Sequence, residues 1–219
     1  MKKIVEARRL LSPAPAPHAL GYDGTHLWMG SRDTSRMYAI DPNTGSARDE
    51  GQAPGIPWGL TCAGDQLFVC CGEPPDDDRF IHHFTPGRGF HGEERIPAPD
   101  NTGSQLGYDG DTLYLVQWYR KRILAIDENG IVGTIVNGPR GICGLVVTAG
   151  SFYCVTTDAE DTSAYYLTRI DARGAEPVAT DLAQIPFPAR SLAYDGTLFW
   201  TNHRAEDQIV AFEAPSGSF

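Results

Sequence analysis

The 219-residue chain lacks the features that mark membrane, secreted and nucleic-acid-binding proteins. No stretch reaches the roughly 18 consecutive apolar residues of a membrane helix, and the basic segment Met1 to Leu11 has neither the apolar run nor the cleavage site of a secretory signal. Basic residues are few: 18 Lys and Arg against 28 Asp and Glu give a formal charge of −10, whereas nucleic-acid binders concentrate positive charge. We therefore expect a cytoplasmic protein with neither a membrane nor a nucleic-acid partner.

Cysteines are also few, and they lack the spacing of a metal site. Their number is odd, and no CxxC pair occurs among Cys62, Cys70, Cys71, Cys143 and Cys154. This pattern argues against both a disulfide framework and a zinc ribbon. Glycine and proline, by contrast, are plentiful at 24 and 16 residues, and they supply the many tight turns that an all-β protein requires.

The chain consists largely of inexact copies of one unit, seen most clearly in YDGTLFWTNHRAEDQIVAFE from Tyr194. The turn glycines of the copies are spaced by 40, 46, 40 and 46 residues and are Gly24, Gly64, Gly110, Gly150 and Gly196. This period is typical of a propeller blade, and the Asp-Gly and Ala-Gly pairs suit the hairpin between its first two strands. We predict a single-domain, all-β, five-bladed propeller with four-stranded blades at 18–54, 57–97, 103–137, 141–182 and 188–213 plus 2–10.

The last of these units is incomplete, and the first segment of the chain is left over. Lys2 to Leu10 reads as a strand without a hairpin partner, whereas the tail after Glu213 is too short to supply a fourth strand. Joining the two closes the ring and removes an exposed sheet edge. We predict that Lys2 to Leu10 is the outer strand of the fifth blade, with Ile4 facing the neighbouring packing surface.

The repeats resemble the broad group of YWTD-, NHL- and gluconolactonase-like propellers, and FWTN at 199–202 is close to the first of these. SQLGYDGDTLY from Ser104 resembles the start of plant-type glutaminyl cyclotransferases, although Leu115 and Val116 replace the Glu-Ser of those enzymes. These resemblances imply a five-bladed fold. Gluconolactonase-like members hold calcium with a glutamate, an asparagine and an aspartate. Asn202 and Asp158 match the last two, and no glutamate occupies the expected first-strand position.

Candidate site residues follow from aligning the units. The residue two positions before the first-strand leucine differs in every unit and is His18, Trp58, Ser104, Cys143 or Arg190. Unlike residues at equivalent positions near the axis are what an asymmetric ligand requires, although neutral drift of rim residues is the alternative. A second set on the next strand is polar and either orients a ligand or satisfies loop backbone: Ser31, Cys71, Gln117, Thr156 and Asn202.

The loops beyond that strand supply further candidates for the mouth of the funnel: Arg32, Asp33, Glu73, Trp118, Tyr119, Asp158, His203 and Arg204. His18 and His203 come from units that become neighbours when the ring closes, so either could be a general base, with Arg190 binding an anion. Trp58 and Tyr119 would form an apolar wall, and the remaining predicted substrate contacts are Glu73, Cys143, Asp158 and Asn202. Alternatively, the two imidazoles with Glu73 or Asp158 would hold a divalent metal.

These residues favour a small-molecule enzyme, a lyase, isomerase or hydrolase, with its site in the central funnel. Its type of chemistry resembles that of virginiamycin-lyase-like propellers. The alternative is a non-catalytic module that presents the same mouth, or its blade edges, to a ligand or a protein.

Overall fold

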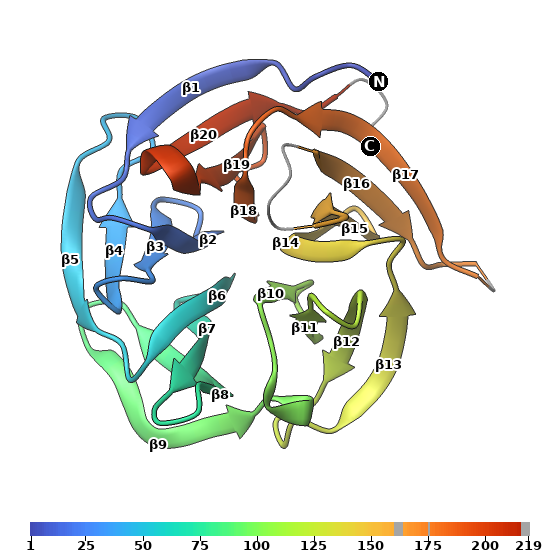
Figure 1. The fold of residues 1–219 in the computed structure, drawn as a ribbon. Helices are drawn as coiled ribbons and strands as arrows, with labels where there is room; N and C mark the ends of the chain where they lie inside the picture. Colours follow the sequence, from blue (N-terminus) through green and yellow to red (C-terminus); the bar gives the residue numbers. More distant parts are fainter. Residues whose placement is uncertain (160–163, 175, 216–219) are drawn as a thin grey trace.

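Five antiparallel sheets of four strands each surround a central axis in the computed structural model, which describes residues 1–159, 164–174 and 176–215 (Figure 1). The first two blades comprise β2 (Pro17–Tyr22), β3 (Leu27–Ser31), β4 (Arg36–Ile40) and β5 (Ala47–Gln52), then β6 (Ile56–Ala63), β7 (Gln66–Glu73), β8 (Asp78–Thr85) and β9 (Gly89–Pro97). The third comprises β10 (Gln105–Tyr108), β11 (Leu113–Gln117), β12 (Arg122–Ile126) and β13 (Val132–Asn137). The fourth comprises β14 (Gly141–Thr148), β15 (Ser151–Thr157), β16 (Tyr165–Asp171) and β17 (Val178–Ile185). The predicted five-bladed propeller is confirmed.

The fifth blade shows how the ring closes. It contains β18 (Ala189–Tyr194), β19 (Leu198–His203) and β20 (Gln208–Glu213), and its outer strand is β1 (Glu6–Leu11) from the other end of the chain. Leu10 pairs with Ile209 in the antiparallel ladder, and Ile4 is buried between the fourth and fifth blades. The predicted closure by the N-terminal strand is therefore confirmed, and β20 is covered instead of forming a free sheet edge.

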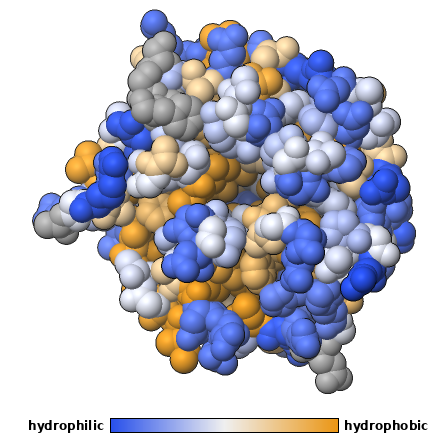
Figure 2. All heavy atoms as spheres, turned by 180° about the vertical axis from the view of Figure 1, so that it is seen from behind, coloured by the Kyte–Doolittle hydropathy of each residue, from blue (hydrophilic) through white to orange (hydrophobic). Residues whose placement is uncertain are grey.

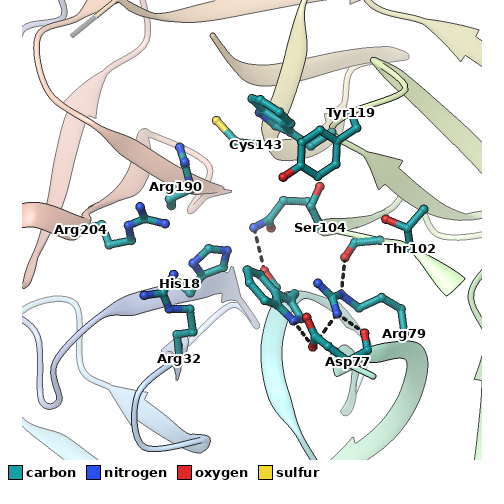
Figure 3. A pocket seen from close by; sticks show the side chains of 14 residues that line it. His18, Arg32, Asp77, Arg79, Thr102, Ser104, Tyr119, Cys143, Arg190 and Arg204 are labelled. Atoms are coloured by element: carbon teal, nitrogen blue, oxygen red, sulfur yellow. Dashed lines mark hydrogen bonds and ion pairs between the residues drawn. The ribbon is translucent and has the colours of Figure 1, made fainter. Parts of the chain in front are cut away.

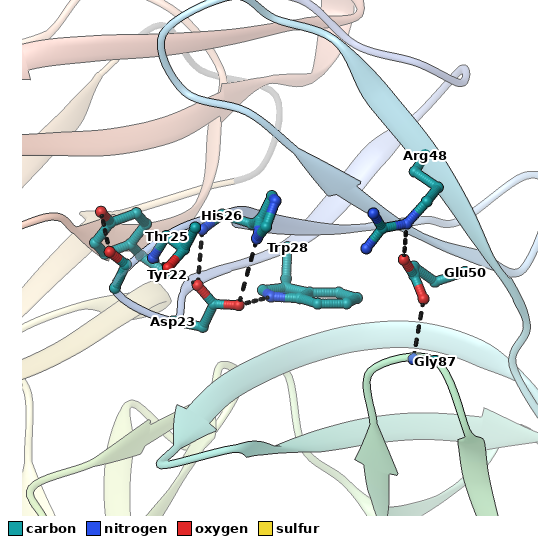
Figure 4. A network of polar contacts seen from close by, with 9 residues as sticks. Tyr22, Asp23, Thr25, His26, Trp28, Arg48, Glu50 and Gly87 are labelled. Carbon is teal, nitrogen blue, oxygen red and sulfur yellow. Dashed lines mark hydrogen bonds and ion pairs between the residues drawn. The ribbon is translucent and has the colours of Figure 1, made fainter.

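Three of the hairpins between inner strands share one hydrogen-bonded turn. In the first blade, Oδ1 of Asp23 accepts the amides of Thr25 and His26, and Oδ2 accepts the indole N–H of Trp28 (Figure 4). The hydroxyl of Tyr22 donates to the carbonyl of Gly24. Asp109 and Asp195 make the equivalent contacts in blades three and five. The repeated Tyr-Asp-Gly sequence is thus a structural turn in which the carboxylate replaces missing backbone acceptors.

The apolar core is divided among the junctions between blades, with one buried cluster for each of the five adjoining pairs in the described residues. Helices in the same residues are two 3-10 turns, η1 (Pro99–Asn101) and η2 (Arg204–Glu206), and neither has the length or the apolar character needed to cross a bilayer. Both short helices lie on the face seen in Figure 1, where the loops surround the axis.

Four of the five innermost strands are irregular at one point each. β2 shifts register between Pro17 and Ala19, β6 between Pro57 and Gly59, and β14 between Ile142 and Gly144. β18 shifts between Arg190 and Ala193. Such β-bulges leave a residue out of the ladder and re-aim its side chain. The unpaired positions lie close to the axis and determine what occupies it.

Candidate functional site

A cavity of about 370 Å³ opens at the axis on the face seen in Figure 1. All five blades contribute to it, and its described lining residues are His18, Arg32, Trp58, Asp77, Arg79, Thr102, Gly103, Ser104, Gln105, Trp118, Tyr119, Cys143, Arg190 and Arg204 (Figure 3). All five residues of the predicted first-strand set are among them. They meet because His18, Trp58 and Cys143 are the extra residues of three bulges, while Arg190 precedes the fourth bulge and Ser104 precedes β10.

His18 lies at the wall of the cavity in a buried, electropositive environment. Its side chain is buried, its ring meets Trp58 edge to face at 4.9 Å, and Nδ1 is enclosed without a hydrogen-bond partner in the described part of the chain. Burial holds the pKa of His18 well below its ordinary value, and the charge of nearby arginines, Arg190 first among them, lowers that pKa further. The imidazole is therefore neutral at neutral pH.

Positive charge dominates the rest of the cavity. The described lining contains four arginines, Arg32, Arg79, Arg190 and Arg204, against one carboxylate, Asp77. Asp77 pairs with Arg79 at 2.5 Å, so one of these charges is locally compensated. Arg190 is buried and donates to the hydroxyl of Tyr165 at 3.0 Å, which fixes its guanidinium beside the axis. A cavity of this charge suits an anion and does not fit a calcium ion.

Aromatic side chains form the opposite wall. In Figure 3, Arg32, Arg190, Arg204 and His18 lie on one side of the cavity, and Tyr119 lies across from them. Trp118 packs perpendicular to Tyr119, with the ring centroids 4.7 Å apart. Three of the four arginines come from blades one and five and the aromatic side from blade three, while Arg79 of blade two is paired with Asp77. The two ends of the cavity therefore differ in chemistry.

Gln105 and Ser191 close the floor of this cavity. The hydroxyl of Ser191 donates to Oε1 of Gln105 at 2.7 Å across the axis, and Nε2 of Gln105 donates to the carbonyl of Trp58. On the far face hydrophobic residues surround the axis (Figure 2), and a second hollow of about 180 Å³ lies there, lined partly by Tyr22, Leu60 and Tyr194. Because β10 and β18 run from one hollow to the other, the Gln105 to Ser191 bond separates them.

Several predicted site residues lie outside the cavity. His203 is buried with its ring stacked on Phe187 at 4.4 Å, because the end of β19 turns this side chain toward the loop before β18. Asn202 donates Nδ2 to the carbonyl of His18 and so supports the backbone of the bulge. Neither side chain is among the described lining residues of the cavity, so of the two predicted bases only His18 lies there.

Two acidic candidates are also placed elsewhere. Glu73, at the end of β7, binds His82 at 2.8 Å and pairs with Arg95. Asp158 is exposed and lies 3.5 Å from Arg140. No three His, Cys, Asp or Glu side chains within the described ranges lie close enough to hold a metal ion. The alternative metal set of two imidazoles with Glu73 or Asp158 is thus not assembled.

The polar set on the second strands mostly satisfies loop backbone. Ser31 donates to the carbonyl of Pro15 and Gln117 to that of Pro99, in addition to the contact from Asn202. This is the second of the two readings that the sequence allowed for that set.

Asp77, Arg79 and Gln105 belong to the cavity but were missing from the sequence-based candidates. Asp77 stands in an acidic run that resembles a solvated loop. Its carboxylate instead accepts the indole N–H of Trp58 at 3.1 Å, and the Arg79 guanidinium lies 4.3 Å from that ring. One indication was available from the sequence: Arg79 follows the long loop after β7, at the point where the chain comes back to the mouth of the cavity. For Gln105 the indication was its place directly after Ser104, which the alignment of the repeats had already selected as a site residue.

Comparison with known proteins supports the architecture. The PQQ-bound aldose sugar dehydrogenase of Streptomyces coelicolor has a similar structure, with a TM-score of 0.63 and 14% identity over 96% of this chain and 98% of that one. The calcium-binding protein regucalcin of Agrobacterium tumefaciens gives 0.58 and 12% over 97% and 95%, and hydrazine synthase of Kuenenia stuttgartiensis gives 0.56 and 15% over 90% and 64%. At these identities the likeness shows the propeller fold alone. No family model and no curated protein matches the sequence.

Proposed function

We propose that the protein is an enzyme that binds a small carboxylate in the mouth cavity and abstracts a proton from it with His18. One observation carries this proposal: a buried, neutral imidazole lies in a cavity lined by four arginines. A base is useful when it is deprotonated at the working pH, and a carboxylate is bound well by guanidinium groups. The cavity volume of about 370 Å³ suits a small molecule.

The reaction starts at the carbon next to the carboxylate. His18 takes the proton from that carbon, and the electron pair of the C–H bond passes into the carboxylate group. Arg190, held by Tyr165 and the carbonyl of Ala189, stabilises the added negative charge. If the next carbon carries a leaving group, that group departs with its electron pair and a double bond forms, which is a lyase reaction. If the acid carries a β,γ double bond instead, return of the proton at the γ carbon moves the double bond, which is an isomerase reaction.

Binding without catalysis is the second candidate. It is favoured by Nδ1 of His18, since a catalytic imidazole is usually oriented by a hydrogen bond at its second nitrogen and none is made in the described part of the chain. The aromatic and cationic walls would then serve recognition only.

The test combines binding with turnover. Calorimetry and thermal unfolding are measured with a panel of carboxylates, including β-substituted acids that eliminate, and with the matching alcohols. A carboxylate at a hundredfold excess over its dissociation constant should raise the free energy of unfolding by about 2.7 kcal/mol. His18→Gln should lower kcat by roughly 10²–10⁴-fold with little change in KM, because it removes the base and keeps the arginines.

His26→Gln is the matched control, because His26 lies at the hairpin turn after β2, at the other end of that strand from His18, and should leave turnover unchanged. Carboxylates that bind but are never converted would favour the binding module. If no carboxylate binds more tightly than its alcohol, the anion site itself is wrong.

A further inference from the structure

We infer that the ligand is an aryl carboxylate, with its ring held by Trp118 and Tyr119 and its carboxylate at the arginine side. This inference rests on the proposed function and adds the substrate class. It starts from the separation of the two walls (Figure 3). Arg32, Arg190 and Arg204 lie on the side of blades one and five, and Tyr119 lies across the cavity on blade three. The fourth arginine, Arg79 of blade two, lies away from these three and is paired with Asp77. A ligand that fills such a cavity needs an anionic end and an apolar end.

The aromatic wall has the shape of a corner. The rings of Trp118 and Tyr119 touch edge to face and are perpendicular, at 90°, so a planar ring placed in the angle that they form can stack on one and present its edge to the other. Tyr119 is 81% exposed, a large aromatic surface left to solvent at the mouth. Trp58, by comparison, already has the Arg79 guanidinium 4.3 Å from its ring and His18 at its edge. The uncovered aromatic surface of the cavity is therefore the corner of Trp118 and Tyr119.

The Trp118 side of this corner is held in place by packing before any ligand binds. Trp118 and Tyr119 sit in the turn between β11 and β12, closed by the amide of Lys121, which donates to the carbonyl of Trp118 at 3.1 Å. The indole of Trp118 lies against Gly141, where an added Cβ would be 2.7 Å from Nε1 and Cε2. Nε1 of Trp118 is buried and has no partner among the described residues. Because the glycine at position 141 leaves room for the indole, the contact between the two is formed before a ligand binds.

The size of the cavity limits the ligand to a single ring. At about 370 Å³ it lies near the lower end of the 300–1,000 Å³ range of ligand pockets, and the arginine side must also accommodate the carboxylate. Phenylacetate has this size and both chemical ends. It is the probe for the test, together with acetate, cyclohexylacetate and 2-phenylethanol.

Affinities of the four probes are measured on the full chain by calorimetry and by tryptophan fluorescence. Trp118 and Trp58 line the cavity, whereas Trp28 and Trp200 are buried in the core between blades. Phenylacetate should bind roughly 3–10-fold more tightly than cyclohexylacetate, since an aromatic pair gains beyond area burial. It should also bind more tightly than acetate and 2-phenylethanol.

Two variants test the corner itself. Tyr119→Ala changes an exposed side chain, and Gly141→Ala displaces Trp118 without altering any charge. Each should abolish the preference for phenylacetate over cyclohexylacetate and leave the affinity for acetate unchanged. Gly133→Ala is the control, because its added Cβ would meet the carbonyl of Ala125 at an ordinary 3.8 Å.

The outcomes separate this inference from the proposed function. If acetate or cyclohexylacetate binds as tightly as phenylacetate, the aryl class is wrong and a carboxylate site remains. Binding of 2-phenylethanol as tight as that of phenylacetate would overturn the anionic end and with it the aryl carboxylate. If none of the four probes binds, both proposals are wrong.

Discussion

Ile4 should contribute a measurable share of the stability of the propeller, because it anchors the strand that closes the ring. Its side chain is 8% exposed and packs in the cluster of Phe187, Ile185 and Phe212, between the fourth and fifth blades. Its backbone also joins the two blades, since the Ile4 amide donates to the carbonyl of Gln184 at 2.9 Å. The perturbation is Ile4→Ala.

The magnitude follows from the burial of this side chain. Replacing a buried Ile by Ala costs about 2–5 kcal/mol, and we expect about 2 kcal/mol here because residues near a chain end can relax into the space left behind. For a chain of this length each kcal/mol lowers the Tm by about 2–4 °C, so Ile4→Ala should lower it by about 4–8 °C. Val5→Ala is the matched control: Val5 is 59% exposed, and its loss should change stability by less than about 0.5 kcal/mol.

Deletion of residues 1–11 extends the same experiment. It removes the side chain of Ile4, the contact of its amide with Gln184, and the bond in which the amide of Glu213 donates to the carbonyl of Val5 at 3.0 Å. Several kcal/mol should be lost out of the 5–15 kcal/mol that holds a typical domain folded, and the bare edge of β20 should promote self-association. Urea unfolding and size-exclusion chromatography measure both. Equal unfolding of Ile4→Ala and Val5→Ala, or a monomeric deletion variant with unchanged Tm, would refute the reasoning.

Two further predictions concern the site. Because burial depresses the pKa of His18 in the folded state, only the unfolded chain takes up this proton just below pH 6.5, so stability should fall on acidification by up to about 1.4 kcal/mol per pH unit. His18→Gln should therefore flatten the dependence of the urea unfolding midpoint on pH between pH 7 and pH 5. An unchanged dependence would contradict the depressed pKa. Gly144→Ala should cost about 1–3 kcal/mol, since its Cβ would lie 2.7 Å from the backbone of Ser191, whereas Gly133→Ala should unfold like the unmodified protein.

The sequence was sufficient to predict the fold because the repeat carries its own turn chemistry. The Asp-Gly turns at Gly24, Gly110 and Gly196 need positive φ, and all three glycines adopt it, at 97°, 105° and 96°. Closure by Lys2 to Leu10 was predicted because this segment lacks a hairpin partner and the last blade lacks a fourth strand. Pairing the segment with the last blade supplies both. Both signals are local or topological, and neither depends on the packing of particular side chains.

The candidate site could be predicted only in part. Aligning the repeats gave the height of a residue along the axis, and at that height His18, Trp58 and Cys143 line the cavity. The alignment did not give side-chain direction on the second strand, where Asn202 turns to the carbonyl of His18 in the bulge of β2 and His203 turns to an aromatic ring. The alignment also did not predict how the long loops fold back onto the cavity. Asp77 is folded back onto Trp58 by a left-handed turn at φ 61°, and nothing in the acidic run predicts that contact.

The bulges explain how a repeated blade can build an asymmetric cavity. A residue in the ladder must place its side chain on one face of the sheet, where it packs in a junction between blades, as Leu20 and Leu60 do. The extra residue of a bulge has no cross-strand partner, so its side chain is not required by that packing. His18 and Trp58 can therefore differ completely while the leucines two positions later stay alike. Packing in the core fixes the backbone at these points, whereas the side chain of the extra residue can vary to suit the ligand in the cavity.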